Sequence, residues 1–298
     1  MADSVEMQDI RGLEIDKLLK GFALTEFTFK NECTVSDTTG DAIRWYQETS
    51  ADLTATAPSV VANVSPLSVF PTLEVTWTRD TSYVRKYAAE GFISMEDIKT
   101  ADIDVLARSI LRITRAVAKQ VDTRIYNVMT EYSAATGLPA PINIQTFATT
   151  AVGGDQWDAA AAAADIVKDL LHAKYLLQNY GYNPEGASLI LNPIQARDMM
   201  TWLITGKGSS IPAFSSEKVR TGTVMSILGL NVKVSNNATT DYALVIVPQQ
   251  AVTWKSLTPL TARTIEDVGI GTKVRVWEEG EAILTDPKAV VLITDTVT

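Results

Sequence analysis

Polar and apolar residues alternate along two nearby stretches of the chain, which predicts a long β-hairpin. In the second stretch the apolar positions are every other residue, the period of a half-buried strand: Leu73, Val75 and Trp77. The sequence IRWYQET at 43–49 supplies the partner arm. We therefore expect residues 41–84 to form an extended hairpin loop.

The segment between the two arms, Leu53–Leu73, contains no charged residue. Its larger apolar side chains are Leu53, Val60, Val61, Val64, Leu67, Val69, Phe70 and Leu73. Burying all of them is worth about 12–24 kcal/mol, whereas fixing the backbone costs about 1–2 kcal/mol for each residue of the segment. The segment is therefore not expected to fold on itself, and something outside the hairpin must cover it.

A stripe of apolar residues with gaps of three and four predicts a long amphipathic helix beginning near Ser94. The stripe consists of Ile103, Leu106, Ile110, Ile113, Val117, Val121, Ile125 and Val128. Ser94 and Asp97 suit a helix N-terminus, and Arg and Lys follow later, as the helix dipole favours. About thirty residues of helix span about 45 Å, which is long enough to support a sheet.

Helices and short strands alternate in the second half of the chain, which predicts an α/β or α+β unit. An Ala-rich helix is expected from Asp155 to Tyr180, with Gly181 ending it. Asn192 as N-cap and Pro193 at the first helical position predict a further helix. The C-terminal part is again β and is expected to pack on the long helix. The chain is thus expected to form two lobes.

Composition excludes several classes of protein. The chain has 298 residues, 46 % of them hydrophobic, which argues against disorder. Its net charge of −9 argues against tight, sequence-specific binding of nucleic acid. The single cysteine excludes an internal disulfide and a multi-cysteine metal site. The N-terminus has no signal-peptide pattern, so a cytoplasmic setting is expected. Prolines in the charge-free segment argue against a membrane span.

No residue makes a convincing catalytic or cofactor-binding candidate. His172, the only histidine, lies in the middle of a predicted helix without a nucleophile elbow, so a structural role is favoured. Cys33 has only that histidine as a potential base. The GKGSS sequence at 206–210 lacks the first glycine and the final Ser or Thr of a phosphate loop. The VGIGTKV sequence at 268–274 is interpreted as a turn.

Metal binding is not predicted either. Glu278, Glu279 and Glu281 are close together, but no pattern of alternating oxygen ligands surrounds them. We interpret them as a face exposed to solvent or to another subunit. Aromatic residues often anchor interfaces, and two tryptophans lie on the hairpin arms. The predicted inter-subunit contacts are Trp45, Val61, Leu67, Val69, Phe70 and Trp77.

The order of these parts resembles the major capsid protein of tailed double-stranded-DNA bacteriophages, of the Hong Kong 97 type. The local sequences that carry the resemblance are GFISMEDI, YGYNPEGASLILNP and the run GxVxxIxGLxVxVS at 222–235. The resemblance implies an α+β fold. Its parts are an N-terminal arm at 1–40, an extended loop at 41–84, a peripheral domain with the spine helix at 85–136 and 251–298, and an axial domain at 137–250.

The resemblance also implies a function. The chain is expected to be a structural protein, not an enzyme, that assembles into an icosahedral shell around double-stranded DNA. Its expected partners are further copies of itself in pentamers and hexamers, a separate scaffolding protein and a portal. Packaged DNA is expected to be held without sequence-specific contacts. No cofactor and no membrane are implied, and the expected location is the virion, after assembly in the host cytoplasm.

Two departures from the family bear on these expectations. Some relatives crosslink covalently through a lysine of the extended loop, but Leu53–Leu73 contains no lysine, so crosslinking is not expected. Some relatives begin with a long scaffolding segment, whereas only a short arm precedes the loop here.

Three alternatives remain open at this stage. Encapsulin-type compartments resemble the same fold and enclose enzymes instead of a genome. The other two are an unrecognised hydrolase that uses Asp or Glu, with its site near His172, and a phage tail or adhesion module.

Overall fold

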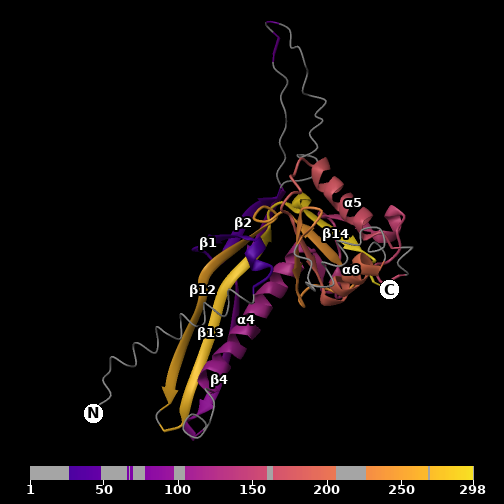
Figure 1. Cartoon of the computed structure of the whole chain (residues 1–298). Coiled ribbons are helices and arrows are strands. Elements are labelled where there is room, and N and C mark those ends of the chain that lie inside the picture. The colour runs from indigo at the N-terminus through magenta and orange to yellow at the C-terminus, as the bar shows by residue number, and fades with distance from the viewer. Residues whose placement is uncertain are drawn as a thin grey trace. The chain divides into compact units, whose positions relative to one another are not determined.

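The computed structural model describes residues 27–47, 66, 68–69, 78–96, 105–159, 164–205, 226–267 and 269–297. These residues divide into two compact units (Figure 1). The first unit draws on residues between 27 and 43, 82 and 126, and 253 and 283. The second draws on residues between 44 and 81, 127 and 252, and 284 and 297. Each unit thus combines segments that are far apart in the sequence.

The first unit contains a four-stranded sheet with the strand order β1-β12-β13-β4. The strands are β1 (Thr34–Asp37), β12 (Val252–Asp267), β13 (Gly271–Leu284) and β4 (Arg85–Ser94). β1 pairs in parallel with β12, and β13 pairs antiparallel with β4. The 3-10 helix η1 (Lys30–Glu32) precedes β1. Strand β4 was not predicted, although exposed and less exposed residues alternate along much of it.

The long helix of the first unit is α4, Val105–Met129, which lies alongside the β12–β13 hairpin in Figure 1. The predicted apolar stripe faces the interior, because Ile110, Val117, Val121 and Ile125 are fully buried. The helix is therefore amphipathic as predicted. Ser94, the predicted N-cap, is the last residue of β4, and Met95 and Glu96 directly after it are helical, as predicted. Residues 97–104 lie outside the described part.

The second unit contains a six-stranded sheet with the order β7-β14-β11-β8-β10-β9. The strands are β7 (Gln145–Ala148), β14 (Val290–Thr294), β11 (Ala243–Ile246), β8 (Ser188–Leu191), β10 (Leu230–Val234) and β9 (Ser226–Ile227). Every residue of β8 and β11 is buried. Such strands read as continuous apolar runs, here SLIL and ALVI, because both faces of the sheet are covered.

The C-terminal strand β14 pairs with β7 and β11 in this second sheet. The sequence placed it with the long helix, together with the rest of 251–298. The structure instead divides this segment, since β12 and β13 lie in the four-stranded sheet. The β-strand pattern predicts a strand but carries no information about its partner, which is why the sequence did not separate the two.

Helix α5, Ile166–Asn179, begins later than predicted. Asp155 and Ala164 form an isolated parallel bridge, and Trp157 donates its backbone N–H to Thr296 O at 2.8 Å. The tertiary contacts of Trp157 thus override the helix propensity of the surrounding sequence. The predicted end is confirmed, because Gly181 follows the helix with a φ of +83°.

Helix α6, Pro193–Thr205, confirms the predicted N-cap. The Asn192 side chain accepts the N–H of Ile194 at 3.1 Å, and the Gln195 side chain accepts the N–H of Asn192 at 2.9 Å. These reciprocal bonds form a capping box. Four further short elements belong to this unit. They are the 3-10 helices η2 (Thr149–Val152) and η3 (Pro287–Ala289) and the paired strands β5 (Tyr132–Ser133) and β6 (Leu138–Pro139).

The predicted hairpin arms pair with each other. β2 (Ala42–Gln47) and β3 (Thr78–Tyr83) form a two-stranded sheet. Of the charge-free segment between them, only Pro66, Ser68 and Val69 belong to the described residues. Among the helices that the structure describes, none is long and apolar enough to cross a membrane.

Candidate assembly surfaces

Two of the six predicted contact residues are described, and both belong to the hairpin loop. Val69 exposes 92 % of its surface. Trp45 on β2 is half-buried, and its indole N–H has no hydrogen-bond acceptor among the described residues. The other four lie outside the described part: Val61, Leu67, Phe70 and Trp77. The loop therefore presents an apolar side chain to solvent in the isolated chain.

The two paired arms carry further exposed aromatic residues. Tyr46 on β2 is 58 % exposed and Tyr83 on β3 is 70 % exposed. Tyrosine is enriched at protein interfaces because it combines a large apolar ring with a polar group. These two residues were not among the predicted contacts, although both flank the strand pattern in the sequence.

A second exposed apolar group lies on the first unit, near the β12–β13 turn. Phe92 on β4 is 52 % exposed and Ile270 in the turn is 62 % exposed. A Cβ atom at Gly271 would lie 2.9 Å from Phe92 Cζ, so the phenyl ring lies against this glycine. The sequence correctly predicts a turn here. The signal for a surface contact was an isoleucine between two glycines in a turn, where polar residues are usual.

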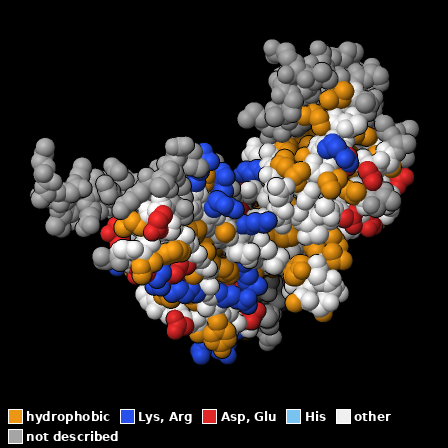
Figure 2. All heavy atoms as spheres, turned by 90° about the horizontal axis from the view of Figure 1, so that it is seen from below, with side chains coloured by type: hydrophobic (Ala, Val, Ile, Leu, Met, Phe, Trp, Pro, Cys, Tyr) orange, Lys and Arg blue, Asp and Glu red, His pale blue; other side chains and the backbone are white. Residues whose placement is uncertain are grey.

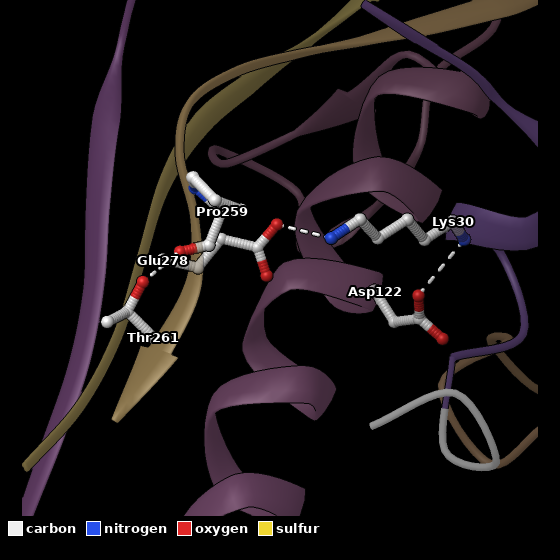
Figure 3. Close-up of polar contacts among 5 residues, drawn as sticks. All are labelled: Lys30, Asp122, Pro259, Thr261 and Glu278. Carbon is white, nitrogen blue, oxygen red and sulfur yellow. Dashed lines mark hydrogen bonds and ion pairs between the residues drawn. The ribbon is translucent and has the colours of Figure 1, made fainter. Parts of the chain in front are cut away.

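The N-terminal segment is fastened to α4 and β13 inside the first unit. Asp122 of α4 accepts the backbone N–H groups of Thr28, Phe29 and Lys30, at 2.6, 3.3 and 3.1 Å. The Lys30 ammonium forms an ion pair with the buried Glu278 of β13. Figure 3 shows Lys30 bridging the two acids, with its backbone on Asp122 and its side chain on Glu278.

These contacts set the electrostatics of Asp122. Burial raises the pKa of its carboxyl group to about 6, and the three backbone N–H groups limit the rise. The carboxyl group that attaches the N-terminal segment to α4 therefore titrates near pH 6 instead of near pH 3.8.

The acidic cluster on β13 corrects a prediction from the sequence. Glu278 and Glu281 are buried, whereas an exposed face was expected. The Glu281 carboxylate accepts a hydrogen bond from Arg124 Nε at 2.8 Å and forms an ion pair with Arg85 Nε at 3.2 Å. Glu279 is more accessible and pairs with Lys86 at 3.1 Å. The basic partners come from distant parts of the sequence, so the residues around 278–281 alone could not reveal the burial.

The two residues considered for catalysis, His172 and Cys33, have contacts that suit a structural role. The His172 ring lies edge-on against Phe147, with the ring centres 4.7 Å apart. Cys33 is buried and its thiol donates to Phe29 O at 3.4 Å. Burial raises the pKa of this thiol, which disfavours the reactive thiolate. Within the described ranges, no three His, Cys, Asp or Glu side chains are grouped to hold a metal ion.

The family of the chain is decided by its sequence from the second hairpin arm onward. A family described as phage capsid protein matches residues 78–293, which is most of the chain. The chain belongs to the phage capsid protein family. The capsid protein is therefore a structural component of the virion and not an enzyme, as predicted. Among curated proteins, no sequence matches it.

Solved structures show the fold of the capsid protein. The capsid of cyanophage P-SCSP1u matches with a TM-score of 0.62 and 17 % identity, over 90 % of this chain and 88 % of that one. A structure of Mycobacterium phage Che8 matches with a TM-score of 0.60 and 16 % identity, over 91 % of this chain and 92 % of that one. A virus-like particle from Pyrococcus furiosus matches with a TM-score of 0.61 and 10 % identity, over 95 % of this chain and 99 % of that one. The predicted Hong Kong 97-type α+β capsid fold is thus confirmed.

Proposed function

We propose that the capsid protein forms an icosahedral shell of pentamers and hexamers around double-stranded DNA, in which each hairpin loop is covered by a neighbouring copy. The 92 % exposure of Val69 carries this proposal, because the charge-free segment around it needs an apolar cover. In a symmetric assembly every copy presents the same loop and the same receiving surface. Trp45, Val61, Leu67, Val69, Phe70 and Trp77 are proposed to bury against that neighbour.

The proposal extends to the domains and the partners. The four-stranded sheet with α4 would form the peripheral domain, the six-stranded sheet with α5, α6 and the C-terminal strand β14 would form the axial domain, and residues 1–40 would form an arm. A separate scaffolding protein and a portal would take part in assembly in the host cytoplasm. Because the net charge is −9, packaged DNA would be held without sequence-specific contacts.

Replacing Val69 by aspartate tests the loop contact. A carboxylate at the centre of an apolar interface must be desolvated without a partner, so V69D is expected to raise the protein concentration needed for particle formation by at least about 10-fold, or about 1.4 kcal/mol per contact. V69T is the matched control, because threonine has nearly the shape of valine and no charge. Assembly is measured by sedimentation and electron microscopy. Equal assembly of V69D and the wild type would contradict the proposal.

An encapsulin-type compartment is the second candidate, favoured by the match to the Pyrococcus furiosus virus-like particle over 95 % of this chain. Such a compartment would contain protein cargo instead of a genome. Purified particles should be treated with nuclease and then analysed for protected DNA and for enclosed proteins. Protected genome-length DNA supports the viral shell, and an enclosed enzyme without DNA supports the compartment.

A further inference from the structure

Helix α4 exposes a row of positive charges. Arg108, Arg112, Arg115 and Lys119 are all exposed, and they follow each other with gaps of four, three and four residues. Residues with this spacing lie on the same side of a helix. We call these four residues the basic stripe. The acid within α4, Asp122, is buried and points to the backbone of residues 28–30.

The stripe has the opposite sign to the chain as a whole, which has a net charge of −9. Arg124, on the same helix, is paired with Glu281. By contrast, Arg108, Arg112 and Lys119 have no ion pair with any residue that the structure describes. Their charges are thus not needed to hold the described fold together. Figure 2 shows many Lys and Arg side chains on the face of the molecule seen from below.

A hollow of about 420 Å³ lies between β4 and α4, next to the stripe. Lys86 and Lys119 contribute to its wall, and the small residues Ala88, Ala89 and Ala116 line it. Lys86 contacts Glu279, while Lys119 has no ion pair in the described part of the chain. The hollow therefore has space for an anionic group beside a cation that no described residue neutralises.

The stripe lacks what a protein partner would require. Interfaces between proteins depend on large apolar or aromatic anchors at their centre, and no large apolar side chain of α4 is among the exposed ones in the described part. The four cations lie within twelve residues of helix, and the first and last are about 17 Å apart along the helix axis. Double-stranded DNA carries a phosphate about every 3.4 Å along each strand, so about five phosphates lie along that length.

We propose that the basic stripe of α4 binds the phosphate backbone of packaged double-stranded DNA. This inference rests on the proposed viral shell and adds the surface that meets the genome. Contacts to phosphates position a duplex without reading its sequence. An acidic chain can thus hold DNA locally while its overall charge keeps the contact weak.

The test compares two double variants of the full-length protein with equal charge changes. R112Q/K119Q removes half of the stripe. K168Q/R263Q removes two exposed cations on α5 and β12 that have no ion pair among the described residues. Binding of the unassembled subunits to a fluorescent 30-base-pair duplex is measured by anisotropy from 50 to 200 mM KCl.

Each lost phosphate contact lowers the slope of log Kobs against log[KCl] by about 0.9. R112Q/K119Q should therefore reduce the slope by about 1.8, so that the wild type loses about 12-fold more affinity than the variant between 50 and 200 mM. K168Q/R263Q should keep the wild-type slope. An equal reduction in both variants, an unchanged slope in R112Q/K119Q, or no binding by the wild type at 50 mM KCl would overturn the proposal.

Particle formation by the same proteins separates this inference from the proposed shell. R112Q/K119Q should form particles of normal size. If it fails to assemble while its DNA slope stays unchanged, the stripe contacts another protein subunit and the inference is wrong. If the wild type forms no closed particle, the proposed function fails, and the DNA slopes still decide the role of the stripe separately.

Discussion

At the scale of single residues, the buried ion pairs of the first unit are its most vulnerable contacts. Glu281 joins β13 to Arg124 of α4 and to Arg85 of β4. A buried carboxylate is costly to desolvate, and its pairing offsets that cost only while both partners are present. The same unit contains Glu279, whose side chain is 22 % exposed and pairs with the exposed Lys86, and this pair provides an internal comparison.

We expect E281Q to lower the free energy of unfolding by about 2–3 kcal/mol. Breaking a buried pair costs about 3–5 kcal/mol, and the partial exposure of Arg124 and Arg85 reduces this. The control E279Q should cost about 0–1 kcal/mol, because its pair is accessible to solvent. Urea denaturation of the unassembled subunit measures both, and equal effects would contradict the assigned burial.

Asp122 should make stability depend on pH. Its pKa is raised from 3.8 to about 6, so the folded state binds this proton more tightly than the unfolded state. The stabilisation is complete below pH 3.8 and is lost as the pH rises through 6. Relative to D122N, the wild type should gain about 1 kcal/mol between pH 7 and pH 5. Urea denaturation at both pH values checks this, and an unchanged difference between the two proteins would refute it.

At the scale of elements, the close packing of β12 on β13 depends on Gly280. A Cβ at this position would lie 2.5 Å from Trp254 Cζ2 and 2.7 Å from Lys255 O. The indole ring and the backbone carbonyl have little freedom to move, and Trp254 is fully buried. A side chain here thus cannot be accommodated without shifting a strand.

G280A is therefore expected to destabilise the subunit by about 1–3 kcal/mol through overpacking. At Gly40, a Cβ would meet only Ala42 O at 3.8 Å. G40A should be neutral or stabilise slightly, because alanine restricts the unfolded chain. Thermal unfolding of the two variants measures the difference, and a neutral G280A would show that β13 moves away from Trp254 at little cost.

The elements that the sequence predicted well are those with local signals. Asn192, Pro193 and Gln195 lie within four residues of each other and together specify the start of α6. The hairpin was predicted from the alternation at Leu73, Val75 and Trp77, which lie outside the described residues, and the observed β3, which pairs with β2, directly follows them in the chain. The start of α5 was predicted too early, because Trp157 is held by Asp169 and Thr296, contacts that no local pattern encodes.

Only part of the candidate surfaces was predicted, again because the sequence shows local patterns and not contacts between distant segments. A charge-free loop is visible in the sequence, and the described Val69 is exposed. The exposure of Phe92 depends on its pairing opposite Lys273 on β13, far away in the chain. The basic stripe was hidden by the overall charge of −9, because a bulk value does not show how exposed charges are distributed.

At the scale of the whole molecule, the capsid protein combines a firmly packed interior with apolar residues that its own described residues do not cover. Phe92, Ile270 and Val69 are exposed at positions that belong to different parts of the chain. Exposed apolar residues mark an association surface where they form a contiguous patch. Membership of a phage capsid protein family gives those surfaces a role, since a capsid protein is a component of a shell.

Hydrogen exchange of peptides covering Leu53–Leu73, compared between unassembled subunits and purified particles, tests the central claim most directly. If a neighbouring copy covers the loop, its amides should exchange at least about 10-fold more slowly in particles, while peptides from the buried strands β8 and β11 should exchange equally in both. Equal exchange of the loop peptides in subunits and particles would contradict the account.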